Sequence, residues 1–157
     1  MRYGALFWAG FAAFLLDQAS KYLVVHVMGV AQRGPIDVLP PLLVFRYGEN
    51  RGINFGLFQG DNDAARWILI VLALAICLGV FVWLARSARS RWMLISGGLL
   101  IGGALANVVD RLLYGYVLDF LNMSCCGIDN PFVFNLADVF IFAGALGLML
   151  FDGKKAP

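Results

Sequence analysis

Four long apolar runs limit what this chain of 157 residues can fold into. They extend over about residues 5–28, 67–85, 92–109 and 132–151, and a transmembrane helix needs roughly 20 mostly apolar residues. Hydrophobic residues make up 61% of the chain and charged residues only 14%, whereas a soluble domain has about 45–50% and about 25%. The sequence therefore predicts an α-helical membrane protein in which four transmembrane helices form a single domain over residues 1–157.

The first run could also be read as a secretory signal peptide. Such a peptide would be followed by a cleavage site of small residues and then by a soluble domain. Further apolar runs follow instead, so we expect the first run to be a membrane span.

Basic residues predict the orientation of these spans. Three arginines lie in the short link between the second and third runs, Arg2 precedes the first run, and Lys154 and Lys155 follow the last one. The positive-inside rule places such residues in the cytoplasm. We therefore expect both termini to be cytoplasmic and two longer loops, at about residues 29–66 and 110–131, to lie outside.

The first outer loop carries strand signals. Residues 42–47 and 53–58 are rich in strand-forming side chains, and glycines separate the two segments. This pattern predicts a small extracytoplasmic β-sheet on the outer membrane surface.

The polar residues in and near the runs converge at one depth. Asp17 lies about 18 Å along the outward-running first helix, at ~1.5 Å per residue, and Asp138 lies near the start of the inward-running fourth helix. The same level is reached by Asp119 in the second outer loop and by the residues that end the third run: Asn107, Asp110 and Arg111. The sequence therefore predicts one site that is open to the extracytoplasmic side.

Asp119 and Asp138 are the candidate catalytic residues. A carboxylate within hydrocarbon is costly and usually functional, and two neighbouring carboxyl groups can share one proton and activate a water molecule. That is the chemistry of an aspartic peptidase. Alternatively, Asp119 is an ordinary exposed acid of a loop. A metal ion is a further, less favoured alternative, with oxygen ligands from Asp119, Asp138, Asn107 and Asn135.

Two further motifs allow a structural or a functional interpretation. Asp17 and Lys21 are four residues apart on one helical face, and a structural ion pair is the favoured interpretation. Asn50 and Gly52 lie in a polar, glycine-rich stretch. This stretch forms either a plain hairpin turn or an exposed backbone that holds a peptide.

The polar cluster at the end of the third run also allows two interpretations. Asn107, Asp110 and Arg111 either anchor a helix at the membrane interface or support a catalytic group. Their spacing alone favours neither interpretation.

Other functions receive less support from the sequence. No His-Glu-x-x-His motif occurs and His26 is the single histidine, so we expect no metal or other cofactor. The net charge of +2 is too small to indicate nucleic acid binding. A solute carrier or a non-catalytic assembly subunit is the alternative. A carrier would need a polar path across the membrane, and the inner halves of the predicted spans contain almost no ionisable groups.

Taken together, the polar motifs resemble those of the bacterial lipoprotein signal peptidases, also called signal peptidase II. The match runs in order through nearly the whole chain, on a four-span frame of the family's length. Its residues are Asp17-Gln-x-Ser-Lys21, then Asn50-x-Gly52 to Phe55-Gly56, then Gly102-Gly-Ala-Leu-x-Asn107-x-x-Asp110-Arg111-x-x-x-Gly115-x-Val117-x-Asp119-Phe120, and Phe134-Asn135-x-Ala137-Asp138. The complete set in this order is far more specific than any one motif.

The resemblance implies an activity and a location. It implies an aspartic endopeptidase of the bacterial inner membrane that removes signal peptides from prolipoproteins, on the amino side of a diacylglyceryl-modified cysteine. The implied partners are the diacylglyceryl-prolipoprotein, membrane lipid and the cyclic peptide inhibitor globomycin, without nucleic acid.

The resemblance also implies roles for individual residues. Asp119 and Asp138 are similar to the catalytic pair of the family. Supporting and substrate-binding positions of the family correspond to Asp17, Lys21, Asn50, Gly52, Asn107, Asp110, Arg111 and Asn135. The chain departs from the family at Ile53 and Asn54, where small residues are usual, and at Ala106, which replaces a common glycine. These departures concern substrate contacts and helix packing, and they leave the expected chemistry unchanged.

Overall fold

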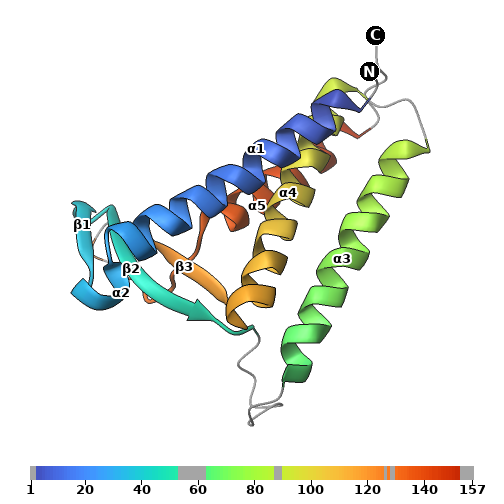
Figure 1. Ribbon diagram of the computed structural model, residues 1–157. Coiled ribbons are helices and arrows are strands. Elements are labelled where there is room, and N and C mark those ends of the chain that lie inside the picture. Colours follow the sequence, from blue (N-terminus) through green and yellow to red (C-terminus); the bar gives the residue numbers. More distant parts are fainter. Residues whose placement is uncertain (1–2, 53–62, 87–89, 126, 128–129, 153–157) are drawn as a thin grey trace.

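The computed structural model describes residues 3–52, 63–86, 90–125, 127 and 130–152. Helices dominate this part of the chain, and a small sheet lies at one end of them (Figure 1). The helices are α1 (Gly4–Lys21), the π-helix η1 (Tyr22–Val27), α2 (Val30–Arg33), α3 (Asp63–Ala85), α4 (Arg91–Tyr114) and α5 (Leu136–Phe151). The strands are β1 (Ile36–Leu39), β2 (Leu43–Asn50) and β3 (Val117–Asn122).

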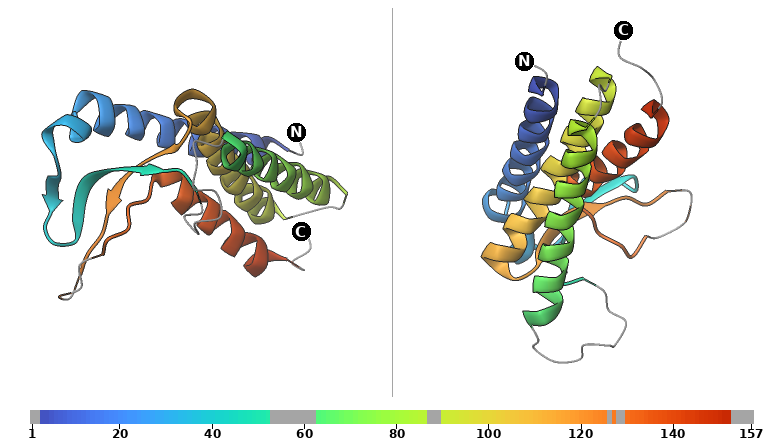
Figure 2. Two further views of the ribbon diagram at one scale, coloured as in Figure 1. Left: turned by 90° about the horizontal axis from the view of Figure 1, so that it is seen from below. Right: turned by 90° about the vertical axis from the view of Figure 1, so that its right-hand side faces the viewer.

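Helix α4 is the centre of the helical part. It packs against α1, α3 and α5, as the two views of Figure 2 show. Helix α3 packs mainly against α4, and its buried residues are only Ile70, Cys77 and Leu84. Most of the α3 surface is therefore apolar and exposed, as expected for a helix that faces lipid.

Small residues bring α4 close to α1 and α5. A side chain at Gly102 would collide with the backbone of Gly10 in α1, and a side chain at Gly103 would collide with the carbonyl oxygen of Ala137 in α5. Such close backbone contacts are typical of helix pairs in membranes. They set the spacing of the three helices about one turn before Asn107.

The sheet is antiparallel, with the strand order β1-β2-β3, and Gly48 of β2 lies opposite Asp119 of β3. The predicted sheet is confirmed, and β2 overlaps the predicted strand at 42–47. The other predicted strand, at 53–58, falls outside the described residues. The sequence predicts neither β1 nor β3. Strand β3 is buried on both faces, so it lacks the alternation of polar and apolar residues that marks a half-buried strand.

Two helix boundaries differ from the predicted runs where the site begins. Helix α4 continues past residue 109 to Tyr114, and Gly115 ends it with a φ of 85°. Asn107, Asp110 and Arg111 therefore all lie on one helix. Helix α5 begins at Leu136 and not at 132, because Asn135 caps it.

The helices agree with a membrane protein by length and composition. Among the described residues, α3 and α4 are long and apolar enough to cross a membrane, and α5 is a shorter apolar helix. The first predicted span is divided between α1 and η1. The start of α1, the end of α3, the start of α4 and the end of α5 lie together, far from the sheet (Figure 1). The number of spans and their orientation stay predictions.

Candidate active site

Strand β3 carries Asp119 into the interior, where the sheet meets the helices. The residue is only 3% exposed. Its neighbour across the sheet is Gly48, and a side chain there would press against Val133 and Asp119. The alternative of an ordinary exposed loop acid is therefore wrong, because the sheet pairing turns Asp119 away from solvent.

Asp138 lies in the first turn of α5, where it forms a capping box with Asn135. The backbone N of Asp138 donates to Oδ1 of Asn135 at 2.9 Å, and the backbone N of Asn135 donates to Oδ2 of Asp138 at 3.3 Å. Two amide groups at the helix start are satisfied in this way. The box fixes the Asp138 carboxylate beside the segment that precedes α5.

Backbone pairing joins that segment to β3. Phe134 donates to the carbonyl oxygen of Leu121 at 2.9 Å, and Leu121 donates to that of Phe134 at 2.8 Å. One residue along, Nδ2 of Asn122 donates to the carbonyl oxygens of Asn130 and Phe132 at 2.7 and 2.8 Å. These hydrogen bonds join the chain just after Asp119 to the chain just before Asp138, and so they fix the separation of the two residues.

Two asparagines connect the carboxyl groups. Nδ2 of Asn135 donates to Oδ1 of Asp119, in addition to the capping contacts with Asp138. Nδ2 of Asn107 donates to Oδ1 of Asp138 at 3.0 Å, and Oδ1 of Asn107 accepts from Nδ2 of Asn135 at 3.4 Å. The predicted residues Asn107, Asn135, Asp119 and Asp138 therefore form one hydrogen-bonded group, which we call the dyad network.

A buried ionic cluster lies against the dyad network. Nζ of Lys21 is 2.7 Å from a carboxylate oxygen of Asp17 and 2.7 Å from one of Asp110. The predicted ion pair of Asp17 and Lys21 is confirmed, and Asp110 is its third member. Lys21 also donates to Oδ1 of Asn107 at 3.2 Å. Because an ammonium group can only donate, it fixes the Asn107 amide with its nitrogen toward Asp138.

The carboxylates of the cluster also hold the backbone next to the catalytic candidates. Oδ1 of Asp17 accepts from the backbone N of Ala137 at 2.8 Å. Oδ2 of Asp110 accepts from the backbone N of Leu118 at 3.1 Å. Asp17 thus positions the helix that carries Asp138, and Asp110 positions the strand that carries Asp119.

Asp119 is electrostatically different from a free carboxylic acid. Burial, followed by the negative charge of Asp138, raises the pKa of Asp119 to about 7. Hydrogen bonds from Asn135 and Asn50, and the charge of Lys21, act in the opposite direction. Near neutral pH the Asp119 carboxyl group can therefore hold a proton, as an acid in catalysis must.

Asn50 and Gly52 lie at the end of β2, beside Asp119. Oδ1 of Asn50 accepts from the backbone N of Gly52 at 3.1 Å, so the predicted turn is present. Gly52 has a φ of 96°, which favours glycine. The Asn50 side chain also bonds to Asp119, and the binding of a peptide by this stretch stays a prediction. Ile53 and Asn54 fall outside the described residues.

A cavity of about 270 Å³ lies beside the dyad network, between α3, α4 and α5. It is lined by Leu69, Leu72, Ala73, Ile76, Leu100, Ala104, Asn107, Arg111 and Ile141. Its polar lining comes from Asn107 and Arg111 alone, and Arg111 donates to the carbonyl oxygen of Asn107 at 3.3 Å. The cavity is therefore apolar on most sides and polar where it borders the dyad network.

Gln18 is the site residue that the sequence reasoning missed. Its Nε2 donates to Oδ1 of Asp110 at 2.8 Å and to the carbonyl oxygen of Ala106 at 3.3 Å. The available signal was an amide side chain directly after Asp17. Leu118 and Ala137 contribute only their backbone N–H groups, so their side chains give no signal in the sequence.

The donor set does not suit the metal alternative. Asn107 and Asn135 present amide nitrogens to Asp138 and Asp119, whereas a metal ion would need their oxygens. Within the described residues, no group of three His, Cys, Asp or Glu side chains could hold a metal ion.

The chain is similar to known proteins over nearly its whole length. The family described as signal peptidase (SPase) II matches residues 10–152. A lipoprotein signal peptidase of Methylorubrum extorquens is 40% identical, covering 93% of this chain and 84% of its own length. One of Aeromonas hydrophila subsp. hydrophila is 42% identical, with 95% and 87% covered.

Solved structures agree with this match. Two bacterial membrane enzymes, determined by the in meso method, share the fold with TM-scores of 0.81 and 0.77, each at 25% sequence identity. The first covers 96% of this chain and 94% of its own, and the second covers 94% and 86%. The chain therefore belongs to the signal peptidase II family of lipoprotein signal peptidases, and it is a bacterial membrane peptidase.

Proposed function

We propose that the chain is an aspartic endopeptidase in which Asp119 and Asp138 activate water to cleave prolipoproteins, on the amino side of the diacylglyceryl-modified cysteine. The observation that carries this proposal is the dyad network. Asn135 joins both carboxyl groups, and Asn107 fixes Asp138 from the other side. Two carboxyl groups held so near each other favour the sharing of a single proton.

The two aspartates have different surroundings, which suggests different roles. Asp119 is the more buried and its pKa is raised to about 7, so we assign the shared proton to it. Asp138 is held instead by two donors, since its carboxyl oxygens accept hydrogen bonds from the Asn107 side chain and from the backbone of Asn135. We therefore assign Asp138 as the general base and Asp119 as the general acid.

The reaction then needs no covalent intermediate. Asp138 takes a proton from water as the water oxygen attacks the scissile carbonyl carbon, and Asp119 donates its proton to the carbonyl oxygen. When the C–N bond breaks, Asp138 gives its proton to the leaving amine. The proton on the former carbonyl oxygen returns to Asp119, and the original state is restored. In this scheme kcat/KM falls as pH rises through about 7, because Asp119 loses its proton.

The cavity between α3, α4 and α5 suits the lipid part of the substrate. Its walls are apolar, and its polar residues, Asn107 and Arg111, lie at the dyad network. A diacylglyceryl chain placed there would bring the modified cysteine to the carboxyl groups. The cyclic peptide globomycin would compete for the same place.

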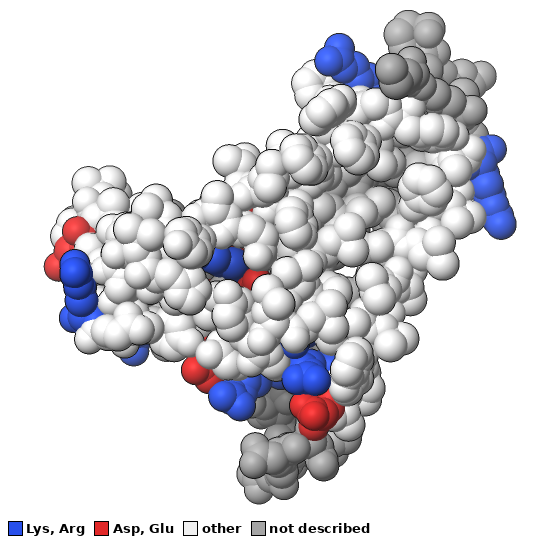
Figure 3. All heavy atoms as spheres, in the orientation of Figure 1, with Lys and Arg blue, Asp and Glu red and all other residues white. Residues whose placement is uncertain are grey.

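We assign the dyad network to the extracytoplasmic side of the inner membrane. The start of α1 and the end of α5 lie far from β3, the strand that carries Asp119 (Figure 1). At that end of the molecule Figure 3 shows Lys and Arg side chains, and Asp152 follows α5 there. By the positive-inside rule this end is cytoplasmic, so the sheet and the dyad network face outward.

Cleavage of a lipobox peptide that carries a diacylglyceryl cysteine tests the proposal. Asp119→Asn and Asp138→Asn should each lose at least about a thousandfold in kcat in detergent, since each removes a proton-transfer step. The control is Asp37→Asn, which changes an exposed acid of β1 and should keep full activity. Full activity of either dyad variant would refute the mechanism and would fit the assembly subunit. Loss of wild-type activity with a chelator would favour a metal.

A further inference from the structure

We propose that a groove between α1 and α4 binds one phospholipid whose headgroup carries an ammonium group. Two adjoining pockets form this α1–α4 groove, one apolar and one polar. Neither pocket shares a lining residue with the cavity that we assign to the substrate, so the groove is separate from that cavity.

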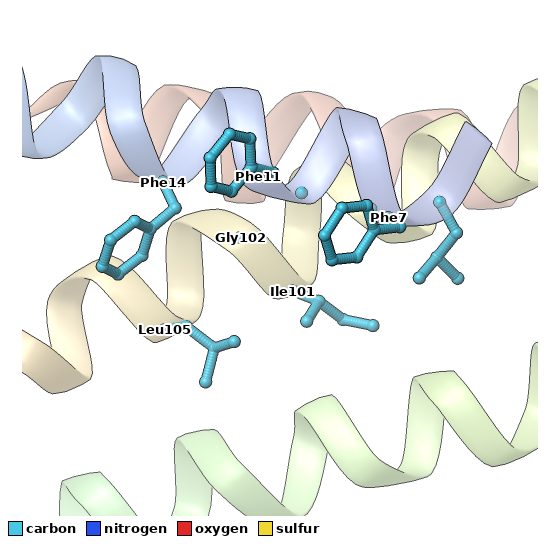
Figure 4. Close-up of a pocket in the computed structure, with 9 residues that line it drawn as sticks. Phe7, Phe11, Phe14, Ile101, Gly102 and Leu105 are labelled. Atoms are coloured by element: carbon cyan, nitrogen blue, oxygen red, sulfur yellow. The ribbon is translucent and has the colours of Figure 1, made fainter. Parts of the chain in front are cut away.

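The apolar pocket has a volume of about 240 Å³. Phe7, Phe11 and Phe14 of α1 lie over Ile101 and Leu105 of α4 in Figure 4. Its remaining lining is Leu6, Gly10, Gly98 and Gly102. The glycines leave the bottom of the pocket without side chains, so an acyl chain can lie against the helix backbones.

The polar pocket continues along the same face of α1. Phe14 lines the apolar pocket and Gln18 lines the polar one, and residues four apart lie one turn apart on one face. The polar pocket measures about 90 Å³, and its lining is Gln18, Lys21, Tyr22, His26, Asp110, Tyr114 and Leu118. This size suits a small headgroup fragment and not a second acyl chain.

Three aromatic rings border the polar pocket. The ring centroids of Tyr22 and His26 are 5.6 Å apart, and those of His26 and Tyr114 are 6.3 Å apart. Tyr22 and Tyr114 are both exposed, and they lie at the start of η1 and at the end of α4. Tyrosine is enriched where a membrane meets water, and aromatic faces attract cations, ammonium groups of ligands included.

The charge at the bottom of the polar pocket favours a cation. Among the described residues, the Asp110 carboxylate contacts three donors: Lys21, Gln18 and the backbone N of Leu118. The same holds for Asp17, whose contacts are Lys21, Gln18 and the backbone N of Ala137.

The cluster combines two carboxyl groups with one ammonium group, Lys21, so its formal charge is −1. Figure 3 shows charged atoms recessed in the otherwise uncharged middle of this face. A headgroup with an ammonium group would bring a compensating charge, whereas an anionic headgroup would be repelled. The apolar pocket holds an acyl chain of the same molecule.

Native mass spectrometry of the intact enzyme tests this proposal. The probes are phosphatidylethanolamine and phosphatidylglycerol with identical acyl chains, added to delipidated protein in detergent. We expect retention of one phosphatidylethanolamine with about a tenfold preference over phosphatidylglycerol, from cation–π and charge effects together. Tyr22→Ala combined with His26→Ala should reduce this preference to about twofold or less while lipid is still retained.

The groove variant is Leu105→Trp, which fills the apolar pocket and should reduce retention of both lipids at least about fivefold. Its matched control, Leu146→Trp on the exposed face of α5, should retain lipid like the wild type. Equal retention of the two lipids would overturn the headgroup assignment, and wild-type retention by Leu105→Trp would overturn the site. Displacement of the lipid by millimolar ethanolamine would also overturn the proposal of a lipid site, because the polar pocket would then recognise a free amine. Retention is measured without substrate, so the result is independent of the catalytic proposal.

Discussion

Asn135 and Asp138 hold each other at the start of α5, with Oδ1 of Asn135 2.9 Å from the backbone N of Asp138 and Oδ2 of Asp138 3.3 Å from the backbone N of Asn135. The same Asn135 side chain donates to Asp119. Helix capping and the link between the two candidate catalytic residues therefore depend on one amide group, and substitutions can separate the two tasks.

Replacing Asn135 should affect stability and activity differently. In Asn135→Ser the hydroxyl group still caps α5, but it is too short to reach Asp119. We expect its thermal stability in detergent to stay near that of the wild type while kcat falls at least about tenfold. Asn135→Ala should lose the activity and, in addition, about 1 kcal/mol of stability. Equal stability losses in the two variants would contradict the capping role.

Lys21 should be essential for folding because it compensates two buried carboxylates. Lys21→Met leaves Asp17 and Asp110 without their cation, which costs about 3–5 kcal/mol in the free energy of unfolding. The triple variant Asp17→Asn, Lys21→Met, Asp110→Asn removes all three charges and should recover part of that loss. Thermal unfolding in detergent measures both, and a triple variant no more stable than Lys21→Met would refute the electrostatic explanation.

The raised pKa of Asp119 makes stability depend on pH. Its carboxyl group binds a proton more tightly in the folded protein, with a pKa of about 7, than in the unfolded chain, where the pKa is 3.8. Its stabilising contribution is complete below the unfolded pKa and is lost as pH rises through about 7. Asp119→Asn has no such group and should unfold like the wild type at pH 4, but should be more stable by about 2–4 kcal/mol at pH 8.

The comparison variant for that measurement is Asp37→Asn on β1, where the acid is exposed. It should differ from the wild type by less than about 0.5 kcal/mol at both pH values. If Asp119→Asn showed the same stability difference at pH 4 and pH 8, Asp119 would not titrate in this range.

The contact between α1 and α4 should not tolerate a methyl group. In Gly102→Ala the new Cβ collides with the backbone of Gly10, so the helices must separate and we expect a loss of about 1–3 kcal/mol. Gly79→Ala makes the same change on α3, where nothing lies within 4 Å of the new Cβ. It should be neutral or stabilise by about 0.5–1 kcal/mol, because alanine favours the helix. Similar effects of both variants on the melting temperature would contradict the packing argument.

The sequence predicted well what depends on hydrophobicity and depth. The convergence of Asp17, Asn107, Asp110 and Asp138 follows from counting residues along apolar runs, and the structure brings these side chains together. The ion pair of Asp17 and Lys21 follows from helical spacing. In each case the local period of a helix determines the result.

The surroundings of Asp119 could not be predicted in this way. Strand β3 is buried on both faces by contacts that are distant in the sequence, so no alternation marks it. The direction of the Asn107 amide is likewise set by Lys21, 86 residues earlier in the chain. Such contacts depend on tertiary packing, which no local pattern records.

The pairing of Leu121 with Phe134, and of Asn122 with Asn130 and Phe132, has a consequence for how the chain can vary. The stretches on either side of the segment between Met123 and Asn130 are joined by hydrogen bonds that do not depend on the length of that segment. Lengthening it adds only a small loop-closure entropy and leaves the segments around Asp119 and Asp138 in register. This segment is therefore a place where an affinity tag or a fluorophore can be inserted.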